Sequence, residues 1–185
     1  MITGERVRLR AINKDDLPQF VVWLNDPEVI RHITIFAPLS LAHEEQWLQE
    51  TLTHPIEVQP LGIEVSVAEG WKLVGDVGFM FLDQRARSSE IGIFIGDKSA
   101  WNKGYGTETM QLMVDYGFKT LNLNRIFLRV YETNPRGLHC YEKVGFQLEG
   151  RMRQAHYLDG KYIDVLLMSI LKSEWLEKKM KEGHK

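Results

Sequence analysis

The sequence predicts an α/β protein with a mixed, largely antiparallel sheet, and three observations support this prediction. Several short stretches alternate apolar and polar residues with the period of a strand. Two pairs of these stretches flank hairpin signals, at Gly70 and at Asp159-Gly160. Two further strands, at 90–96 and 125–131, are separated by a helical stretch. Because such a crossover makes its strands parallel neighbours, we expect one parallel pair in the sheet.

The first third of the chain predicts one strand and two helices. Residues 6–12 alternate three arginines with apolar residues, which is typical of a strand with one wet face or an edge position. Asn13 is suited to cap a helix that ends near Asn25. Ser40 is suited to cap a second helix that ends at about Thr53.

The middle of the chain predicts three strands and a long helix. Residues 61–68 and 73–82 form a hairpin around Gly70, and residues 90–96 alternate isoleucines with other residues as a strand does. From Met110 onward, apolar residues follow the spacing of an amphipathic helix. A glycine-rich turn therefore joins the third strand to this helix.

The last third predicts a strand, a short helix and a hairpin. Residues 125–131 are strongly apolar, and the helix that follows has Pro135 placed to begin it and Gly145 placed to end it. Residues 150–156 and 162–171 flank the Asp-Gly turn as hairpin strands. Beyond them we expect a short, basic, solvated helix.

Composition and charge limit the classes of protein to be considered. With 185 residues, of which 44% are hydrophobic and 26% charged, the chain is typical of one globular domain. We expect a single domain at 1–172 and a short tail at 173–185. The net charge of -2 gives no basic footprint for nucleic acid or for acidic lipid. No 18-residue apolar run and no signal-peptide pattern occur, so we expect a cytoplasmic protein and no membrane partner.

The cysteine and histidine residues predict no metal site. Cys140 is the one cysteine, which excludes an internal disulfide and a multi-thiolate metal centre. None of the six histidines forms a His-x-x-x-His pair. We therefore expect neither a structural nor a catalytic metal.

A strand that ends in a glycine-rich turn at a helix N-terminus can bind an anion. The first turn of a helix has unpaired backbone N–H groups, and the helix dipole adds positive potential there. Gly104 and Gly106 lack a Cβ, so that a phosphate can approach the backbone closely. The P-loop and the dinucleotide fingerprint both require other spacings, so neither is present.

The order of these motifs resembles the GCN5-related N-acetyltransferase (GNAT) superfamily. The matching residues are Gly104, Gly106, Asn134, Tyr141, Gly145 and Phe146. Trp101 stands where the superfamily usually has Gln or Arg, and the wording Trp-x-Lys-Gly-Tyr-Gly-Thr-Glu resembles the branch that acetylates N-termini of ribosomal proteins. The resemblance implies a largely antiparallel sheet of about seven strands, with one parallel pair splayed around acyl-CoA and about four flanking helices. Acetyl-CoA would be the co-substrate.

The resemblance also implies a set of cofactor-binding residues. Pyrophosphate would bind the backbone N–H groups of the turn, and the pantetheine arm would lie along the next strand as an added strand does. Asn134 would bind the pantetheine amide through its side chain. A bulge at Gly96 would part the parallel strands and leave a backbone N–H for the oxyanion. The residues concerned are Phe94, Ile95, Asn102, Lys103, Gly104, Tyr105, Gly106, Thr107, Asn134 and Tyr141.

Two side chains are candidates for proton transfer. Tyr141 is the expected general acid, because a phenol near pKa ~10 can give a proton to a leaving thiolate near ~8.5. Glu90 is the expected general base, directly or through a water, since its position thirteen residues before Lys103 matches the catalytic Glu of histone-acetylating members. A carboxylate near ~4.3 needs a raised pKa for that role. The alternative is a simple charge at the start of a strand.

Three functions follow from these expectations. The first is acetyl transfer to the N-terminal α-amine of a protein such as a ribosomal protein, as in the resembled branch. The second is acetyl transfer to a small amine, a polyamine or an aminoglycoside, with acidic residues such as Glu28, Glu64 and Asp83 around the acceptor. The third is CoA binding without turnover. Members of the resembled branch are commonly dimers, so that the resemblance also allows a homodimer.

Overall fold

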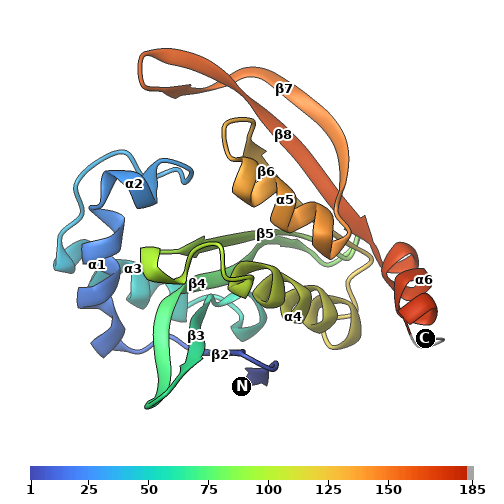
Figure 1. Cartoon of the computed structure of the whole chain (residues 1–185), viewed down its shortest axis with the longest axis horizontal. Coiled ribbons are helices and arrows are strands. Elements are labelled where there is room, and N and C mark those ends of the chain that lie inside the picture. Colours follow the sequence, from blue (N-terminus) through green and yellow to red (C-terminus); the bar gives the residue numbers. More distant parts are fainter. Residues whose placement is uncertain (183–185) are drawn as a thin grey trace. The chain divides into compact units, whose positions relative to one another are not determined.

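The protein is described by a computed structural model that covers residues 1–182 (Figure 1). Short 3₁₀ helices lie at Lys14–Asp16, Ile56–Val58 and Lys98–Ala100. The strands and helices are β1 (Ile2–Thr3), β2 (Val7–Ala11), α1 (Leu17–Leu24), α2 (Pro27–Ile30), α3 (Leu41–Leu52), β3 (Leu61–Val67), β4 (Gly70–Asp83), β5 (Ser88–Ile95), α4 (Tyr105–Lys119), β6 (Arg125–Tyr131), α5 (Pro135–Val144), β7 (Gln147–Leu158), β8 (Lys161–Leu171) and α6 (Lys172–Glu182).

The hydrogen-bonding order of the strands is β1-β2-β3-β4-β5-β6-β8-β7. The pairs β1–β2, β2–β3, β3–β4, β6–β8 and β7–β8 are antiparallel, whereas β5 and β6 are parallel. The mixed sheet with one parallel pair is therefore confirmed. The strand beyond the predicted seven is the two-residue β1, and the helices beyond four are α2, which has four residues, and the C-terminal α6.

The chain divides into two compact units. The first unit contains Met1–Phe79 and Gly92–Leu112, and the second contains Met80–Ile91 and the residues from Met113 onward. Each boundary falls inside a regular element, because β4, β5 and α4 each contribute residues to both units. The boundary of the predicted single domain at residue 172 stays a prediction.

The core of the first unit is an apolar cluster centred on α1. Its buried members are Ile12, Leu17, Phe20, Trp23, Leu24 and Val29. Trp23 lies against the backbone of Gly96, where an added Cβ would approach the indole to 2.3 Å. Trp23 is therefore a core residue. Position 96 requires glycine, because any Cβ there would collide with the indole. Of the two predicted N-caps, Ser40 caps α3 by accepting a hydrogen bond from the backbone N–H of His43. Asn13 is instead the N-cap of the 3₁₀ helix before α1, whose own N-cap is Asp16, and α1 ends at Asn25 as predicted.

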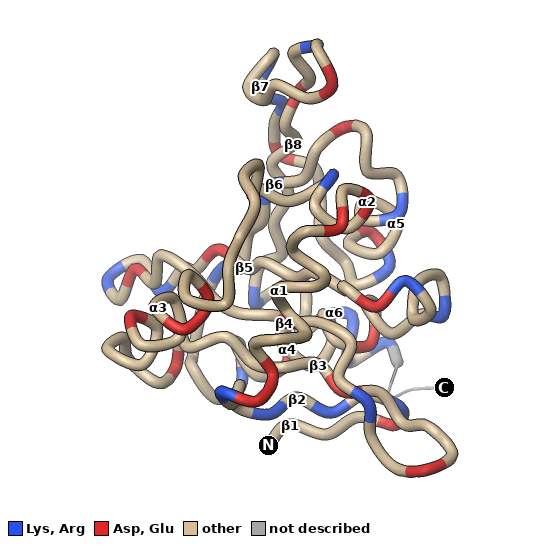
Figure 2. Tube along the Cα trace, turned by 90° about the vertical axis from the view of Figure 1, so that its left-hand side faces the viewer, with Lys and Arg blue, Asp and Glu red and all other residues tan. Residues whose placement is uncertain are grey.

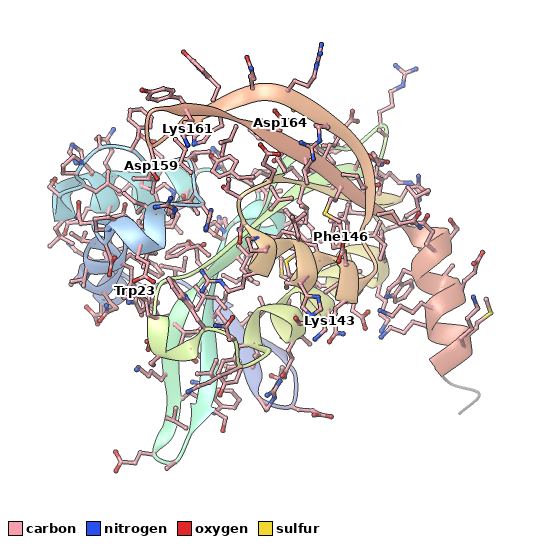
Figure 3. The ribbon with its side chains drawn as sticks, turned by 45° about the horizontal axis from the view of Figure 1, so that its top comes forward. Trp23, Lys143, Phe146, Asp159, Lys161 and Asp164 are labelled. Carbon is pink, nitrogen blue, oxygen red and sulfur yellow. The ribbon has the colours of Figure 1, made fainter. Side chains whose placement is uncertain are left out.

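The second unit contains a long hairpin built from β7 and β8. It extends as a curved ribbon beyond β6 and α5 (Figure 1). Its two-residue turn has left-handed Asp159 (φ 49°) and Gly160 (φ 80°), as the Asp-Gly signal predicts. In Figure 3, Asp159 and Lys161 lie at the turn, and Asp164 lies farther along the hairpin. The pairing of β7 with β8 shifts register between Met152 and His156.

The C-terminal helix α6 differs from the solvated helix that we expect from the sequence. Trp175 is buried, with a side chain that is only 7% exposed. Its indole N–H donates to Asp115 Oδ1 at 2.7 Å, and its ring lies 5.5 Å from that of Phe118. The prediction is wrong at this residue because one large apolar side chain is enough to dock an otherwise polar helix.

Candidate functional site

The glycine-rich turn between β5 and α4 has a backbone conformation that lets a ligand approach it closely. Asn102 (φ 60°) and Gly104 (φ 85°) both have left-handed conformations, and α4 begins at Tyr105. Within the helix, the backbone N–H of Glu108 is bonded to the carbonyl of Gly104 at 3.1 Å. The bonding within α4 therefore begins at Gly104, and helices in general leave the N–H groups of their first turn for partners outside the helix.

The turn is accessible from solvent, which an anion site requires. Asn102, Lys103 and Gly104 are exposed, and the residues up to Glu108 are half-buried. Lys103 adds a positive charge to the helix N-terminus. The glycine backbone, the start of a helix and the lysine fit the pyrophosphate of acyl-CoA chemically.

Phe94 and Ile95, which we expect along the pantetheine arm, lie in the same unit as the turn. The Phe94 ring packs edge-on against those of Phe20 and Trp23, at 6.0 and 6.4 Å between centroids. The carbonyl of Ile95 accepts the indole N–H of Trp101 at 2.7 Å. The tryptophan that departs from the family motif thus binds the strand expected to receive the cofactor, and this carbonyl has one lone pair left.

The backbone at Gly96 is distorted as a bulge would be. The N–H groups of Gly96 and Asp97 both donate to the carbonyl of Val74, at 2.8 and 3.1 Å. This is the irregularity predicted at the end of the strand. However, the Gly96 N–H is itself bonded, so it is not the free donor that the oxyanion would need.

The second unit contains the other three candidates, Glu90, Asn134 and Tyr141. Asn134 is the N-cap of α5, and its Oδ1 accepts the backbone N–H of Gly137 at 2.9 Å. The side-chain oxygen is therefore used to begin the helix. Its Nδ2 group is the part that can donate to a ligand.

Tyr141 lies on α5, two turns after the cap. Its ring is 6.1 Å from that of Phe146, which is buried just after the helix (Figure 3). Burial, with a smaller effect of neighbouring Cys140, raises the pKa of the Tyr141 phenol above its ordinary value. The hydroxyl therefore stays protonated at neutral pH, as a proton donor must, although it is a weaker acid than free tyrosine.

Glu90 forms a two-pronged ion pair with Arg129. Nε of Arg129 donates to Oε1 at 2.8 Å, and Nη2 donates to Oε2 at 3.0 Å. The glutamate side chain is 8% exposed and the arginine side chain 51%. Both carboxylate oxygens are thus occupied, which the sequence does not indicate. The role of Glu90 as a base stays a prediction.

The parallel pairing of β5 with β6 is short. It joins Ser88 to Arg125, Ser89 to Ile126 and Glu90 to Phe127. The register ends at Glu90 although β6 continues to Tyr131, where it still pairs with β8. The pairing therefore covers only the first three residues of β5.

The three carboxylates suggested around an acceptor each have another partner. Lys98 Nζ lies 3.1 Å from Glu28 Oε2, and the Glu64 carboxylate is bound by two arginines of β2. Asp83 accepts the backbone N–H groups of the turn that follows β4. Glu64 and Asp83 are thus engaged within the fold, whereas Glu28 has only an exposed ion pair, with a side chain that is 63% exposed.

Two carboxylates that the sequence analysis misses have no such partner. Glu44 of α3 is 6% exposed, and Asp76 lies on β4 in the same unit. Burial raises the pKa of both groups, and for Asp76 burial together with the charge of Glu44 raises it to about 7. Within residues 1–182, neither carboxylate forms an ion pair or a hydrogen bond, and the neighbouring His43 offsets only part of the effect of burial on the pKa of Glu44. Only the three-dimensional fold brings them together.

Two classes of site find no support in the described part of the chain. Residues 1–182 contain no group of three metal-binding side chains. None of their helices has the length and the apolar character needed to cross a membrane.

Comparison with known proteins identifies the family. Residues 6–147 match the model of the acetyltransferase (GNAT) domain. The chain is 32% identical over 171 residues to an uncharacterised N-acetyltransferase, p20, of Bacillus licheniformis, covering 92% of this chain and 96% of the relative. It is 30% identical over 175 residues to a spermidine N(1)-acetyltransferase of Vibrio cholerae, covering 95% and 98%.

One solved structure, and one relative that matches over a shorter part of the chain, refine this result. The crystal structure of the spermidine N-acetyltransferase from Vibrio cholerae in complex with CoA and spermine superposes with a TM-score of 0.83 and 28% identity, covering 94% of this chain and 99% of that one. A Bacillus subtilis protein provisionally named as a ribosomal N-acetyltransferase is 33% identical, but over 62% of each chain. The ribosomal branch is thus weakly supported. The chain belongs to the GNAT family of acetyl-CoA-dependent N-acetyltransferases.

Proposed function

We propose that the protein transfers the acetyl group of acetyl-CoA to a primary amine of a polyamine. The observation that carries this proposal is the pair of Glu44, which is buried, and Asp76, which is half-buried, because neither carboxylate forms an ion pair or a side-chain hydrogen bond among the described residues. Buried carboxylates are stabilised by a paired cation, and a polyamine has several ammonium groups along one chain. The pair is therefore suited to hold an ammonium group that does not react.

The position of the carboxylates supports the same proposal. Glu44 lies on α3, and in the GNAT superfamily the helices that precede the cofactor-binding part form one wall of the acceptor site. Asp76 lies on β4 within the same unit. The chain matches proteins named as spermidine acetyltransferases over almost their full length, which supports the same class of acceptor.

The chemistry requires a bound thioester, a neutral amine and a proton for the leaving thiolate. The turn at 102–107 would hold the pyrophosphate, and Asn134 would donate to the pantetheine from Nδ2. Bound acetyl-CoA supplies the activated acetyl group. Tyr141, neutral at all physiological pH values, would donate the proton. Glu90 would accept the proton of the amine only through an oxygen released from Arg129.

The direct test is acetyl transfer from acetyl-CoA to a mixed panel of amines, followed by mass spectrometry. The panel contains spermidine, spermine, aminoglycosides and peptides that begin with Ser, Ala, Thr or Met. We expect mono-acetylated spermidine or spermine. Acetylation of peptide N-termini alone would overturn the proposal.

The carboxylate pair is tested by charge-removing variants. Glu44→Gln and Asp76→Asn should each raise KM for the polyamine about 10-fold while KM for acetyl-CoA changes little, since one ion pair in a partly buried site is worth about 1.4 kcal/mol. Glu45→Gln is the matched control, because this residue lies next in the helix and pairs with Lys14 instead. An equal effect of all three variants would contradict the assignment.

The second candidate is acetylation of a protein N-terminus. The motif wording around Trp101 and the partial similarity to the Bacillus subtilis protein favour it. The two proposals differ in the variants as well as in the panel. Because a peptide α-amine lacks further ammonium groups, its KM would not depend on Glu44 and Asp76.

A further inference from the structure

Arg6 and Glu108 connect the first long strand with the start of α4. The backbone N–H groups of Arg6 and Val7 donate to Glu108 Oε1 at 2.7 and 3.1 Å. The Arg6 Nε donates to Oε2 at 3.1 Å. Three donors from one short segment therefore bind a single carboxylate in the first turn of the helix.

The same arginine contacts the glycine-rich turn itself. Arg6 Nη1 donates to the carbonyl of Lys103 at 3.1 Å, and a Cβ added to Gly104 would lie 3.3 Å from Nη2. The guanidinium carbon lies 5.3 Å from the centre of the Tyr105 ring. Arg6 thus contacts Lys103 in the turn and Tyr105 at the start of α4, as well as Glu108.

The charges at this position explain why the arginine is needed. A carboxylate in the first turn of a helix uses part of the positive potential there, and it repels a second anion. Glu108 is 15% exposed, so its charge is only partly screened by water. The Arg6 side chain is 52% exposed, which leaves part of the guanidinium open to a ligand. Figure 2 shows β2 with basic segments along its length.

We propose that Arg6 is a positioning residue for acetyl-CoA, an inference that rests on the turn being the pyrophosphate site. Arg6 fixes the backbone of Lys103 to Tyr105 and neutralises Glu108. The positive potential of the helix N-terminus is then available to the pyrophosphate. The chemical group recognised is the pyrophosphate and not the 3′-phosphate of the adenosine.

The test is direct binding of CoA and of dephospho-CoA by calorimetry, without any acceptor amine. Arg6→Gln should weaken the binding of both ligands about 10-fold, which corresponds to about 1.4 kcal/mol. It should also reduce the dependence of the dissociation constant on salt concentration. Arg8→Gln is the matched control, because Arg8 lies two residues further along the chain, on β2, but pairs with Glu64.

Variants of Glu108 distinguish an electrostatic role of Arg6 from a purely structural one. Glu108→Gln alone should leave CoA binding within about 3-fold of the wild type, because the repelling charge is lost together with the contact. Adding Glu108→Gln to Arg6→Gln should recover most of the lost affinity. If Glu108→Gln instead weakens binding as much as Arg6→Gln, and the double variant is no better, the charge argument is wrong.

The remaining outcomes distinguish this inference from the proposed function. A wild-type protein that does not bind CoA would overturn both. A wild type that binds CoA while Arg6→Gln binds it equally well overturns only the role of Arg6. An effect of Arg6→Gln on CoA but not on dephospho-CoA would overturn the pyrophosphate assignment. Melting temperatures of all variants show whether each one is folded.

Discussion

Arg129 holds both oxygens of the Glu90 carboxylate, with hydrogen bonds of 2.8 and 3.0 Å. This arrangement stabilises the ionised carboxylate, whereas a general base must give up a hydrogen bond to take a proton. The geometry therefore favours an ion pair that joins β5 to β6. A role of Glu90 as general base needs an additional step, the release of one carboxylate oxygen from Arg129.

Glu90→Gln should therefore act mainly on stability. We expect a loss of about 1–3 kcal/mol in the free energy of unfolding, because a buried charged partner is removed while Arg129 remains half in water. The acidic limb of the pH profile of kcat/KM should persist. Disappearance of that limb, with an unchanged melting temperature, would establish Glu90 as the base.

Tyr141→Phe should act on turnover. Removal of the proton donor is expected to lower kcat about 10²-fold while KM for acetyl-CoA changes little. The ring packing against Phe146 is kept in this variant, so the melting temperature should stay close to that of the wild type. Unchanged turnover would show that the phenol is not the acid.

Asp76→Asn should change how stability depends on pH. The folded-state pKa of about 7 lies above the ordinary 3.8, so folding favours the protonated acid. The associated stability is fully present below about pH 4 and is lost as the pH rises through 7. The loss is at most about 4 kcal/mol, and smaller to the extent that water reaches the group.

The amide cannot ionise, so Asp76→Asn should raise the melting temperature at pH 8 more than at pH 5. Asp15→Asn, which replaces an exposed carboxylate of the same unit, is the control for the loss of one carboxylate. Equal shifts for Asp76→Asn at pH 5 and pH 8 would show that Asp76 ionises normally.

Gly96→Ala should destabilise the first unit. The added Cβ would lie 2.3 Å from the Trp23 indole, and the ring is held in the core cluster. Overpacking of this kind typically costs about 1–3 kcal/mol. Gly150→Ala is the control, because no atom lies within 4 Å of its added Cβ. Thermal unfolding that leaves both variants equally stable would contradict the packing.

Trp175→Ala tests whether residues 173–185 are a dispensable tail. The loss of a buried tryptophan should cost about 3–5 kcal/mol, whereas Leu176→Ala, at 45% exposure, should cost little. Chemical denaturation measures both. If the stability of Trp175→Ala equals that of the wild type, the helix is solvated, as expected from the sequence.

The features predictable from the sequence are those that depend on neighbouring residues. Ser40, Gly145 and the Asp159-Gly160 turn act through local geometry, and all have the predicted roles. The parallel pair follows from one helical crossover. Local patterns thus predict most element boundaries and the fold class.

The features that could not be predicted depend on residues far apart in the chain. Arg6 and Glu108 are separated by 102 positions, and nothing local to either indicates the other. Glu90 looks like a free carboxylate until β6 brings Arg129 beside it. Glu44 and Asp76 come close together, and lose much of their contact with water, only in the folded chain. Charge patterns in the sequence do not indicate such burial.

The interleaving of the two units also bears on synthesis by the ribosome. Met1–Phe79 lacks its companion segment Gly92–Leu112 until that segment has been translated, and the intervening residues belong to the other unit. The Gly96 backbone that packs on Trp23 is therefore missing from the early nascent chain. Stable folding should begin late, and a translational pause before residue 112 would leave the apolar side of α1 exposed to chaperones.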